Sequence, residues 1–212
     1  MAQGQMKHIV VCIPFARDYV YRDFMLSWTS MFLYARDKYN LSCLNIIGPY
    51  IDANRDIIVQ DALGMEPDAI LFLDDDQVYP KETPEILLNH LDSGKMIAAG
   101  VTPRKETCEP MLWNYNEDTE KKVELWSDFR GNKGVIKVDG LGLGGVMIHP
   151  DVFHKLDYPF FKIHDAPMYQ RHGEDITFFL KCKKAGIDVW VDLDLQFGHM
   201  VMREVHIGDP PR

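Results

Sequence analysis

Strand-length apolar segments alternate with helix-like segments through the first half of this 212-residue chain. The segments that read as strands are 8–15, 41–47, 69–74 and 96–101. Helices are expected between them at about 23–38, 53–63 and 83–94. The strand segments are almost continuously apolar, which indicates burial on both faces of a parallel sheet. The alternation therefore predicts an α/β fold with a doubly wound, mostly parallel sheet and helices on both faces.

The second half of the chain is less regular. Two short strands, at 134–139 and 145–150, flank the glycine-rich segment GLGLGG, and a helix at 174–184 precedes a strand at 188–195. Because no repeat, low-complexity tract or linker divides the two halves, we expect a single domain over residues 1–212.

Three consecutive aspartates follow the third strand in the stretch AILFLDDDQVYP. Like charges at the end of a buried strand repel one another and are costly to desolvate, so a positive partner is expected there. In an open α/β sheet, ligands bind at the carboxyl ends of the strands. The DxD spacing would let Asp74 and Asp76 hold Mg²⁺ or Mn²⁺ together with substrate phosphates, although turn chemistry or helix capping explains a lone DxD equally well. Asp192 and Asp194 repeat the spacing and are interpreted as the polar face of a strand.

The charge balance limits the ligands to consider. Lys and Arg number 23 against 32 Asp and Glu, a net charge of −9, and no run of basic residues alternates with aromatic ones as in a nucleic-acid groove. Nucleic acid is therefore not expected as a partner, and a nucleoside diphosphate would need a metal ion or a cluster of donors to approach. No apolar run is long enough for a membrane span or a signal peptide, so a cytoplasmic location is expected. The widely spaced cysteines read as reduced core thiols: Cys12, Cys43, Cys108 and Cys182.

The segment GLGLGG matches the dinucleotide fingerprint GxGxxG through Gly140, Gly142 and Gly145. That fingerprint requires a helix after the glycines, whereas the residues that follow read as a strand and reach Pro150. We therefore interpret the segment as a loop whose backbone passes very close to a ligand or to another strand.

Two further features have both a structural and a functional explanation. Glu174 and Asp175 occupy the first turn of a predicted helix, where the helix dipole stabilises carboxylates in any case. Alternatively, Asp175 serves as a general base. His199 follows a strand and is either a hydrogen-bonded structural residue or a metal ligand.

Taken in order, the DxD after a βαβα start, the glycine loop, the ED pair at a helix start and the C-terminal histidine resemble the motifs of GT-A fold glycosyltransferases, close to family 2. The resemblance covers about residues 7–200. It implies a nucleotide-binding half at about 7–101, an acceptor and catalytic half at about 102–200, and a small antiparallel second sheet beside the main one. It also implies Mn²⁺ or Mg²⁺ as a cofactor.

The resemblance implies a role for each matching residue. Asp76 would bind the metal that bridges the donor diphosphate, Asp74 would reach the ribose or the metal, and His199 would complete the metal or phosphate coordination. Asp175, with Glu174 beside it, would take the proton from the acceptor hydroxyl. The remaining donor-binding candidates are Pro14, Ala16, Arg17, Arg55, Asp75, Gly142, Gly144 and Gly145.

The implied activity is transfer of a sugar from a nucleoside-diphosphate sugar, with UDP favoured, to a carbohydrate or other hydroxyl acceptor, with inversion at the anomeric carbon. Two other hypotheses stay open. The stretch ILFLDDDQV also fits the haloacid-dehalogenase phosphatase motif hhhhDxDxV, with Asp74 as nucleophile and Thr102 as a second motif, although that motif normally lies on the first strand. Alternatively, the chain is a non-catalytic module that binds a sugar or a nucleotide.

Overall fold

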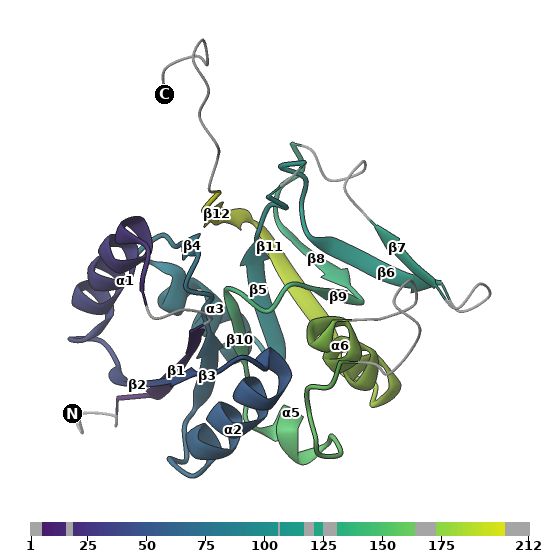
Figure 1. Ribbon diagram of the computed structural model, residues 1–212, viewed down its shortest axis with the longest axis horizontal. Coiled ribbons are helices and arrows are strands. Elements are labelled where there is room, and N and C mark those ends of the chain that lie inside the picture. The colour runs from purple at the N-terminus through teal and green to yellow at the C-terminus, as the bar shows by residue number, and fades with distance from the viewer. Residues whose placement is uncertain are drawn as a thin grey trace.

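The structure is a computed structural model in which helices lie on both faces of a central sheet (Figure 1). It describes residues 6–15, 19–105, 107–116, 121–124, 131–163 and 173–201, with side chains throughout except in 121–124.

The central sheet has seven strands in the order β2-β1-β3-β10-β5-β11-β8. Its strands are β1 His8–Phe15, β2 Asn40–Ile47, β3 Ala69–Phe72, β5 Ile97–Val101, β8 Val135–Val138, β10 Val146–Ile148 and β11 Val189–Gln196. β1, β2, β3, β5 and β11 run in the same direction, whereas β8 and β10 run antiparallel to their neighbours. The expected mostly parallel sheet is therefore confirmed, with β10 inserted antiparallel between β3 and β5.

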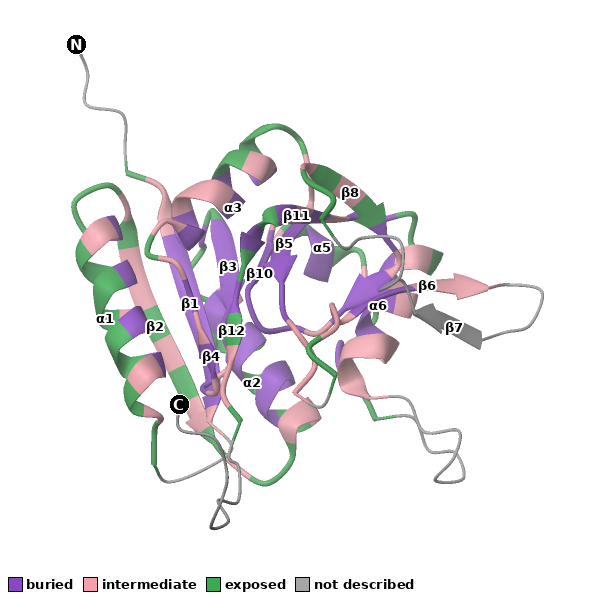
Figure 2. Ribbon diagram, turned by 90° about the horizontal axis from the view of Figure 1, so that it is seen from above, coloured by how far each residue is buried: buried purple, intermediate pink, exposed green. Residues whose placement is uncertain are grey.

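Helices cover both faces of this sheet, as its apolar strands require. Among the described residues, the helices are α1 Arg22–Ala35, α2 Ile51–Leu63, α3 Thr83–Asp92, α5 Asp151–His154 and α6 Glu174–Lys184. On one face α2, α5 and α6 pack on strand residues such as Val10 and Ile70, and on the other α1 and α3 pack on Val11 and Leu71. Figure 2 shows burial concentrated in the inner strands β1, β3, β10 and β5 and in the helix sides that face them, whereas the edge strand β2 is exposed or partly buried. Within the described ranges, every helix is too short or too polar to cross a lipid bilayer.

Two small antiparallel sheets border the central one. β6 Leu112–Asn116 lies between β7 Lys121–Glu124 and β9 Gly140–Leu141. β4 Gln77–Val78 pairs with β12 Gly198–His199. The small antiparallel sheet expected beside the main one is thus present. The β4–β12 pairing also brings the C-terminal histidine beside the aspartate-rich stretch, although the two are far apart in the sequence.

Two expectations about burial need correction. β2 is an edge strand with β1 as its neighbour in the sheet, and its residues are exposed or only partly buried. Cys43 lies on this strand and is exposed, and Cys108 is exposed as well, so neither is a core thiol. Cys12 and Cys182 are buried as expected, and all four thiols are free.

β11 confirms the interpretation of the second DxD. Its side chains alternate between buried and more exposed positions, and Asp192 and Asp194 fall on the more exposed side. Asp192 Oδ2 lies 2.9 Å from the His90 ring, and Asp194 accepts a hydrogen bond from the backbone N–H of Gly134. Both carboxylates therefore have structural partners, as expected for the polar face of a strand.

Candidate functional site

The aspartates lie in a turn that begins just after β3. The strand ends at Phe72, earlier than expected, because the backbone N–H of Asp74 donates to the Tyr79 hydroxyl at 2.8 Å and not to a neighbouring strand. At the other end of the turn, the backbone N–H of Met200 donates to the Asp76 carbonyl at 2.8 Å. The turn is therefore anchored at both ends, at the carboxyl edge of the parallel strands where α/β proteins bind ligands.

A buried arginine joins the first aspartate to the helix that carries the ED pair. Arg55, on α2, has only 6% of its side chain exposed. Its Nη2 lies 2.9 Å from Asp74 Oδ1, and its Nη1 donates to the Glu174 carboxylate. Burial raises the pKa of Glu174, although Arg55 opposes the rise. The structure thus places Arg55, a donor-binding candidate, between two carboxylates, where it ties the end of β3 to the start of α6.

The third aspartate has two partners of its own. Lys105 Nζ lies 2.6 Å from Asp76 Oδ2, and His199 Nε2 lies 3.5 Å from Asp76 Oδ1. Burial raises the pKa of Asp76, but these partners outweigh it and lower that pKa to about 2. For His199 the directions are reversed: burial lowers its pKa, whereas Asp76 and the Pro103 carbonyl raise it, and the net shift of the pKa is upward. Asp76 is therefore ionised at neutral pH, with an imidazole held beside it.

Asp76 and His199 have the chemistry of two metal ligands. His199 Nδ1 donates to the Pro103 carbonyl at 2.8 Å and leaves Nε2 facing Asp76, the arrangement that usually orients a metal-binding histidine. Among the described residues, no group of three His, Cys, Asp or Glu side chains is placed to hold a metal ion. Asp74, the expected third ligand, is turned toward Arg55. Since Mg²⁺ and Mn²⁺ take oxygens from substrate phosphates and water, the pair fits a cation that a diphosphate helps to hold.

A glutamine that the sequence analysis did not single out connects the parts of the site. Gln77 is 2% exposed, and its Nε2 donates to Asp74 Oδ2 at 3.2 Å. The Thr102 hydroxyl lies 3.0 Å from Gln77 Oε1 and 3.3 Å from the Gly144 carbonyl, both of which can accept its proton. The sequence feature that could have identified Gln77 is its position as a polar residue between the DxD and apolar Val78.

The glycine loop passes against this network, in agreement with the interpretation from the sequence. A Cβ on Gly144 would lie 2.2 Å from the Gln77 side-chain nitrogen and 2.5 Å from Asp74 Oδ2. Gly145 has a φ of +78°, and a Cβ there would lie 2.0 Å from the Phe197 ring. The loop leads into β10 and not into a helix, so the GxGxxG match lacks the context of a dinucleotide fingerprint.

Replacing Gly145 with alanine should lower the free energy of unfolding by about 2–4 kcal/mol, because left-handed backbone strain adds to overpacking against Phe197. Gly94 is the matched control, since its φ is +94° and no described atom lies within 4 Å of a Cβ built there. Gly94→Ala should therefore cost the strain alone, about 1–2 kcal/mol. Urea denaturation of both variants measures the difference, and equal losses would contradict the close approach of the loop to Phe197.

The remaining candidates differ in how accessible they are. Asp175 is partly exposed in the first turn of α6, and its Oδ1 accepts the next backbone N–H at 2.7 Å. Asp75 is 4% exposed, and Pro14 is buried within β1. Gly142 lies against a methionine side chain, apart from the aspartates. The candidates outside the described residues are Ala16 and Arg17.

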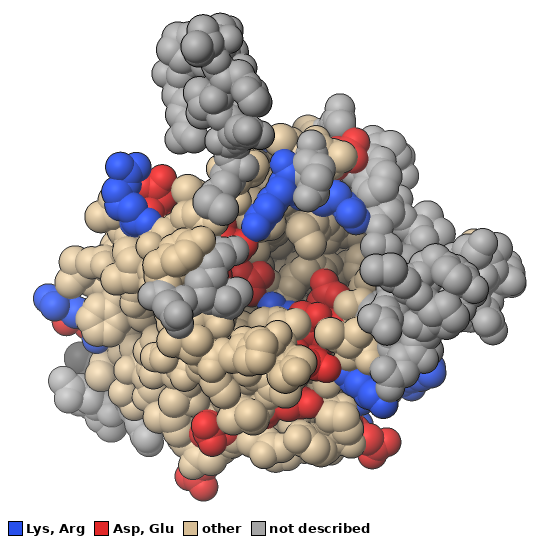
Figure 3. All heavy atoms as spheres, viewed as in Figure 1, with Lys and Arg blue, Asp and Glu red and all other residues tan. Residues whose placement is uncertain are grey.

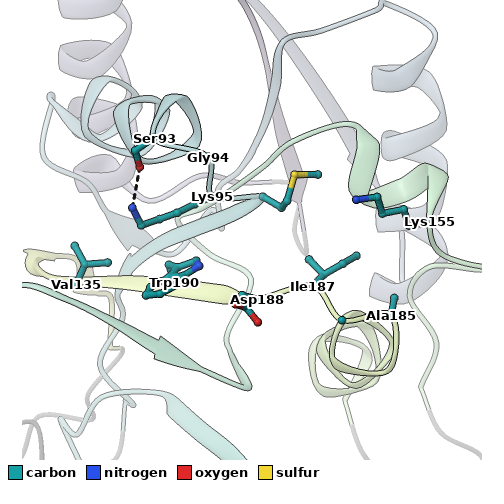
Figure 4. Close-up of a pocket in the computed structure, with 11 residues that line it drawn as sticks. Ser93, Gly94, Lys95, Val135, Lys155, Ala185, Ile187, Asp188 and Trp190 are labelled. Carbon is teal, nitrogen blue, oxygen red and sulfur yellow. Dashed lines mark hydrogen bonds between the residues drawn. The ribbon is translucent and has the colours of Figure 1, made fainter.

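Figure 3 shows a hollow between β12 and α6, with acidic side chains on its walls and Lys and Arg side chains along part of its rim. A different cavity of about 550 Å³ lies at the opposite edge of the sheet, lined by residues before β5 and at the start of β11 (Figure 4). There, Lys95 donates to the Ser93 hydroxyl at 2.8 Å and its ammonium lies 5.6 Å from the centre of the Trp190 ring. That cavity contains none of the candidate site residues.

No family model matches the sequence, and no curated protein matches it. A solved structure matches by fold: A197 from STIV has a TM-score of 0.60 to this chain, with 95% of this chain and 98% of A197 covered. The sequence identity is 16%, so the likeness shows the fold alone. The chain therefore shares with A197 an α/β fold, which here consists of a seven-stranded, mostly parallel sheet bordered by small antiparallel sheets.

Proposed function

We propose that this protein is a metal-dependent glycosyltransferase of the GT-A type, which moves a sugar from a nucleoside-diphosphate sugar, UDP-sugar favoured, to a hydroxyl acceptor. One observation carries the proposal: motifs from distant parts of the chain meet at the carboxyl edge of the sheet. Asp74 shares Arg55 with Glu174, and Asp76 lies beside His199. A turn or a helix cap requires no such long-range contacts, so a shared ligand is the better explanation of the aspartate cluster.

The residue types suit the charges that this reaction moves. Asp76 and His199 would hold Mn²⁺ or Mg²⁺, which supplies positive charge against the diphosphate as it leaves. Asp175 would accept the proton of the acceptor hydroxyl while that oxygen attacks the anomeric carbon. Arg55 would keep the first turn of α6, and with it Asp175, beside the DxD turn. A single displacement of this kind inverts the anomeric configuration.

The same geometry argues against Asp74 as a phosphatase nucleophile. Both of its carboxylate oxygens are engaged, Oδ1 by Arg55 at 2.9 Å and Oδ2 by Gln77 at 3.2 Å. The hydroxyl of Thr102, the second-motif candidate, is directed inward to Gln77 and Gly144. An attacking carboxylate needs a lone pair aimed at its substrate, so the arrangement favours a structural and ligand-orienting role for Asp74.

Calorimetric titration of UDP, GDP, dTDP and CMP, each with and without Mn²⁺, tests the proposal. The wild type should bind one nucleoside diphosphate, with UDP favoured, and the binding should depend on Mn²⁺. Asp76→Ala should weaken this binding at least about 100-fold, because it removes the carboxylate ligand of the cation.

Asp194→Ala is the matched control for this experiment, since it removes the second aspartate of the other DxD, an exposed residue on β11. It should change the nucleotide affinity by less than about twofold, as surface substitutions usually do. If no nucleotide binds under any metal condition, the proposal is wrong, and phosphatase turnover with Asp74→Asn as the negative control becomes the next assay.

A further inference from the structure

Lys105 forms an ion pair with Asp76, the carboxylate that a metal ion would bind. It lies in the segment after β5, and its ammonium is 2.6 Å from Asp76 Oδ2. The other carboxylate oxygen, Oδ1, faces His199 at 3.5 Å. A dication that bound to Asp76 would meet the Lys105 ammonium, and like charges at such short range repel strongly in a partly buried site. The cation and Lys105 therefore compete for one carboxylate.

Lys105 is also the partner best able to leave. Its side chain is 32% exposed, against 6% for Arg55 and 12% for His199. A lysine ammonium is carried on a flexible four-carbon stem and is readily hydrated, so it can swing into water without disturbing the core. His199, by contrast, is fixed by its bond to Pro103 and by the pairing of β12 with β4.

We propose that Lys105 is an exchangeable counter-ion of the metal-binding carboxylate. It neutralises Asp76 before a ligand arrives, gives way to the cation, and then pairs with the diphosphate that accompanies that cation. The inference rests on the proposed glycosyltransferase function, because it takes a nucleoside diphosphate as the ligand.

The exchange of Lys105 for the cation couples the binding of Mn²⁺ to the binding of the nucleotide. Mn²⁺ alone must break the Lys105–Asp76 ion pair, and no new partner receives the ammonium. Once Mn²⁺ is bound, an incoming diphosphate meets both the cation and the released ammonium. Lys105 thus weakens the binding of Mn²⁺ alone and strengthens the binding of the nucleotide to the Mn²⁺ form, which makes the two ligands bind cooperatively.

Two titrations on the full chain test this inference. In the first, electron paramagnetic resonance of free Mn²⁺ measures the metal affinity without nucleotide, and Lys105→Gln should bind Mn²⁺ on the order of tenfold more tightly than the wild type. In the second, UDP is titrated calorimetrically at saturating Mn²⁺, and Lys105→Gln should bind UDP on the order of tenfold more weakly. Lys105→Arg keeps the charge and should resemble the wild type in both. Lys137→Gln, which breaks a surface ion pair with Asp188 of 2.5 Å, is the matched control and should change neither affinity.

The opposite signs of the two effects separate an exchange from a general disturbance of the site, which would weaken both affinities. An unchanged or weaker Mn²⁺ affinity in Lys105→Gln overturns the inference. If the wild type still shows Mn²⁺-dependent UDP binding in that case, the glycosyltransferase proposal stands and only the exchange fails. If neither protein binds Mn²⁺ or any nucleoside diphosphate, both are overturned.

Discussion

Replacing Arg55 with methionine should lower the free energy of unfolding by about 3–5 kcal/mol, the range expected when one member of a buried charge cluster is removed. The guanidinium is 6% exposed and contacts both Asp74 and Glu174, whose side chains are 26% and 13% exposed. Methionine has a similar length but no charge, so both carboxylates would stay partly buried with that partner gone. Urea denaturation at neutral pH measures the loss.

Two comparisons identify the cause of the lower stability expected for Arg55→Met. Lys38→Met removes a more exposed cation from Glu85 and should cost much less stability than Arg55→Met does. Adding Asp74→Asn and Glu174→Gln to Arg55→Met should recover part of the stability, because the uncompensated charges are then absent. If Arg55→Met costs no more than Lys38→Met, Arg55 does not join β3 to α6 in the way described.

The pH dependence of this variant follows from the same charges. Burial raises the pKa of Glu174 above its ordinary value of 4.5 even with Arg55 present, and removing Arg55 raises that pKa further. The folded state then retains a proton that the unfolded state releases above pH 4.5, so stability falls as the pH rises. The deficit of Arg55→Met relative to the wild type should therefore be small near pH 4 and grow toward neutrality.

The order of the longer strands and helices along the chain was predictable because apolar periodicity is a local property, whereas shorter elements such as β6 were not expected. The bounds of β1 and α6 agree with those expected from the pattern, 8–15 and 174–184. Strand direction is not a local property: three buried residues, Val146–Ile148, form β10 between two parallel neighbours, and nothing in their side chains marks them as antiparallel. The length of β3 likewise depends on Tyr79, whose hydroxyl takes the N–H that would have continued the strand.

The candidate site also combines residues that local sequence predicts with contacts that only the fold determines. Strand-end spacing and helix-start chemistry were enough to nominate Asp74, Asp76 and the ED pair as site residues. Arg55 was named as a donor-binding candidate, but its pairing with Glu174 and the pairing of Lys105 with Asp76 were not predictable. These partners are separated by 119 and 29 residues, and the pairings exist only once the sheet has formed. An acidic motif can be read from a sequence, whereas the cations that neutralise it come from wherever the fold places them.

Asp175→Asn should lower sugar-transfer turnover by about 10²–10⁴-fold, because the amide keeps the shape of the side chain but cannot accept a proton. Binding of Mn²⁺ and UDP should change by less than about threefold, since the proposed contacts to the cation and the diphosphate come from Asp76, His199 and Lys105. Release of UDP from UDP-sugar donors, followed with and without acceptor, measures turnover.

Glu174→Gln is the matched control for Asp175→Asn, one residue away and with the same carboxylate-to-amide change. Glu174 is 13% exposed, which is little for a residue that must accept the proton of an incoming hydroxyl. Because Glu174 forms an ion pair with the buried Arg55, Glu174→Gln should lower the free energy of unfolding more than Asp175→Asn does. Turnover that survives in Asp175→Asn would exclude Asp175 as the base.

Metal-dependent UDP binding without turnover in the wild type, against any acceptor tried, would favour the non-catalytic module. A product with the anomeric configuration of the donor would rule out the single displacement, because one attack on the anomeric carbon must invert it.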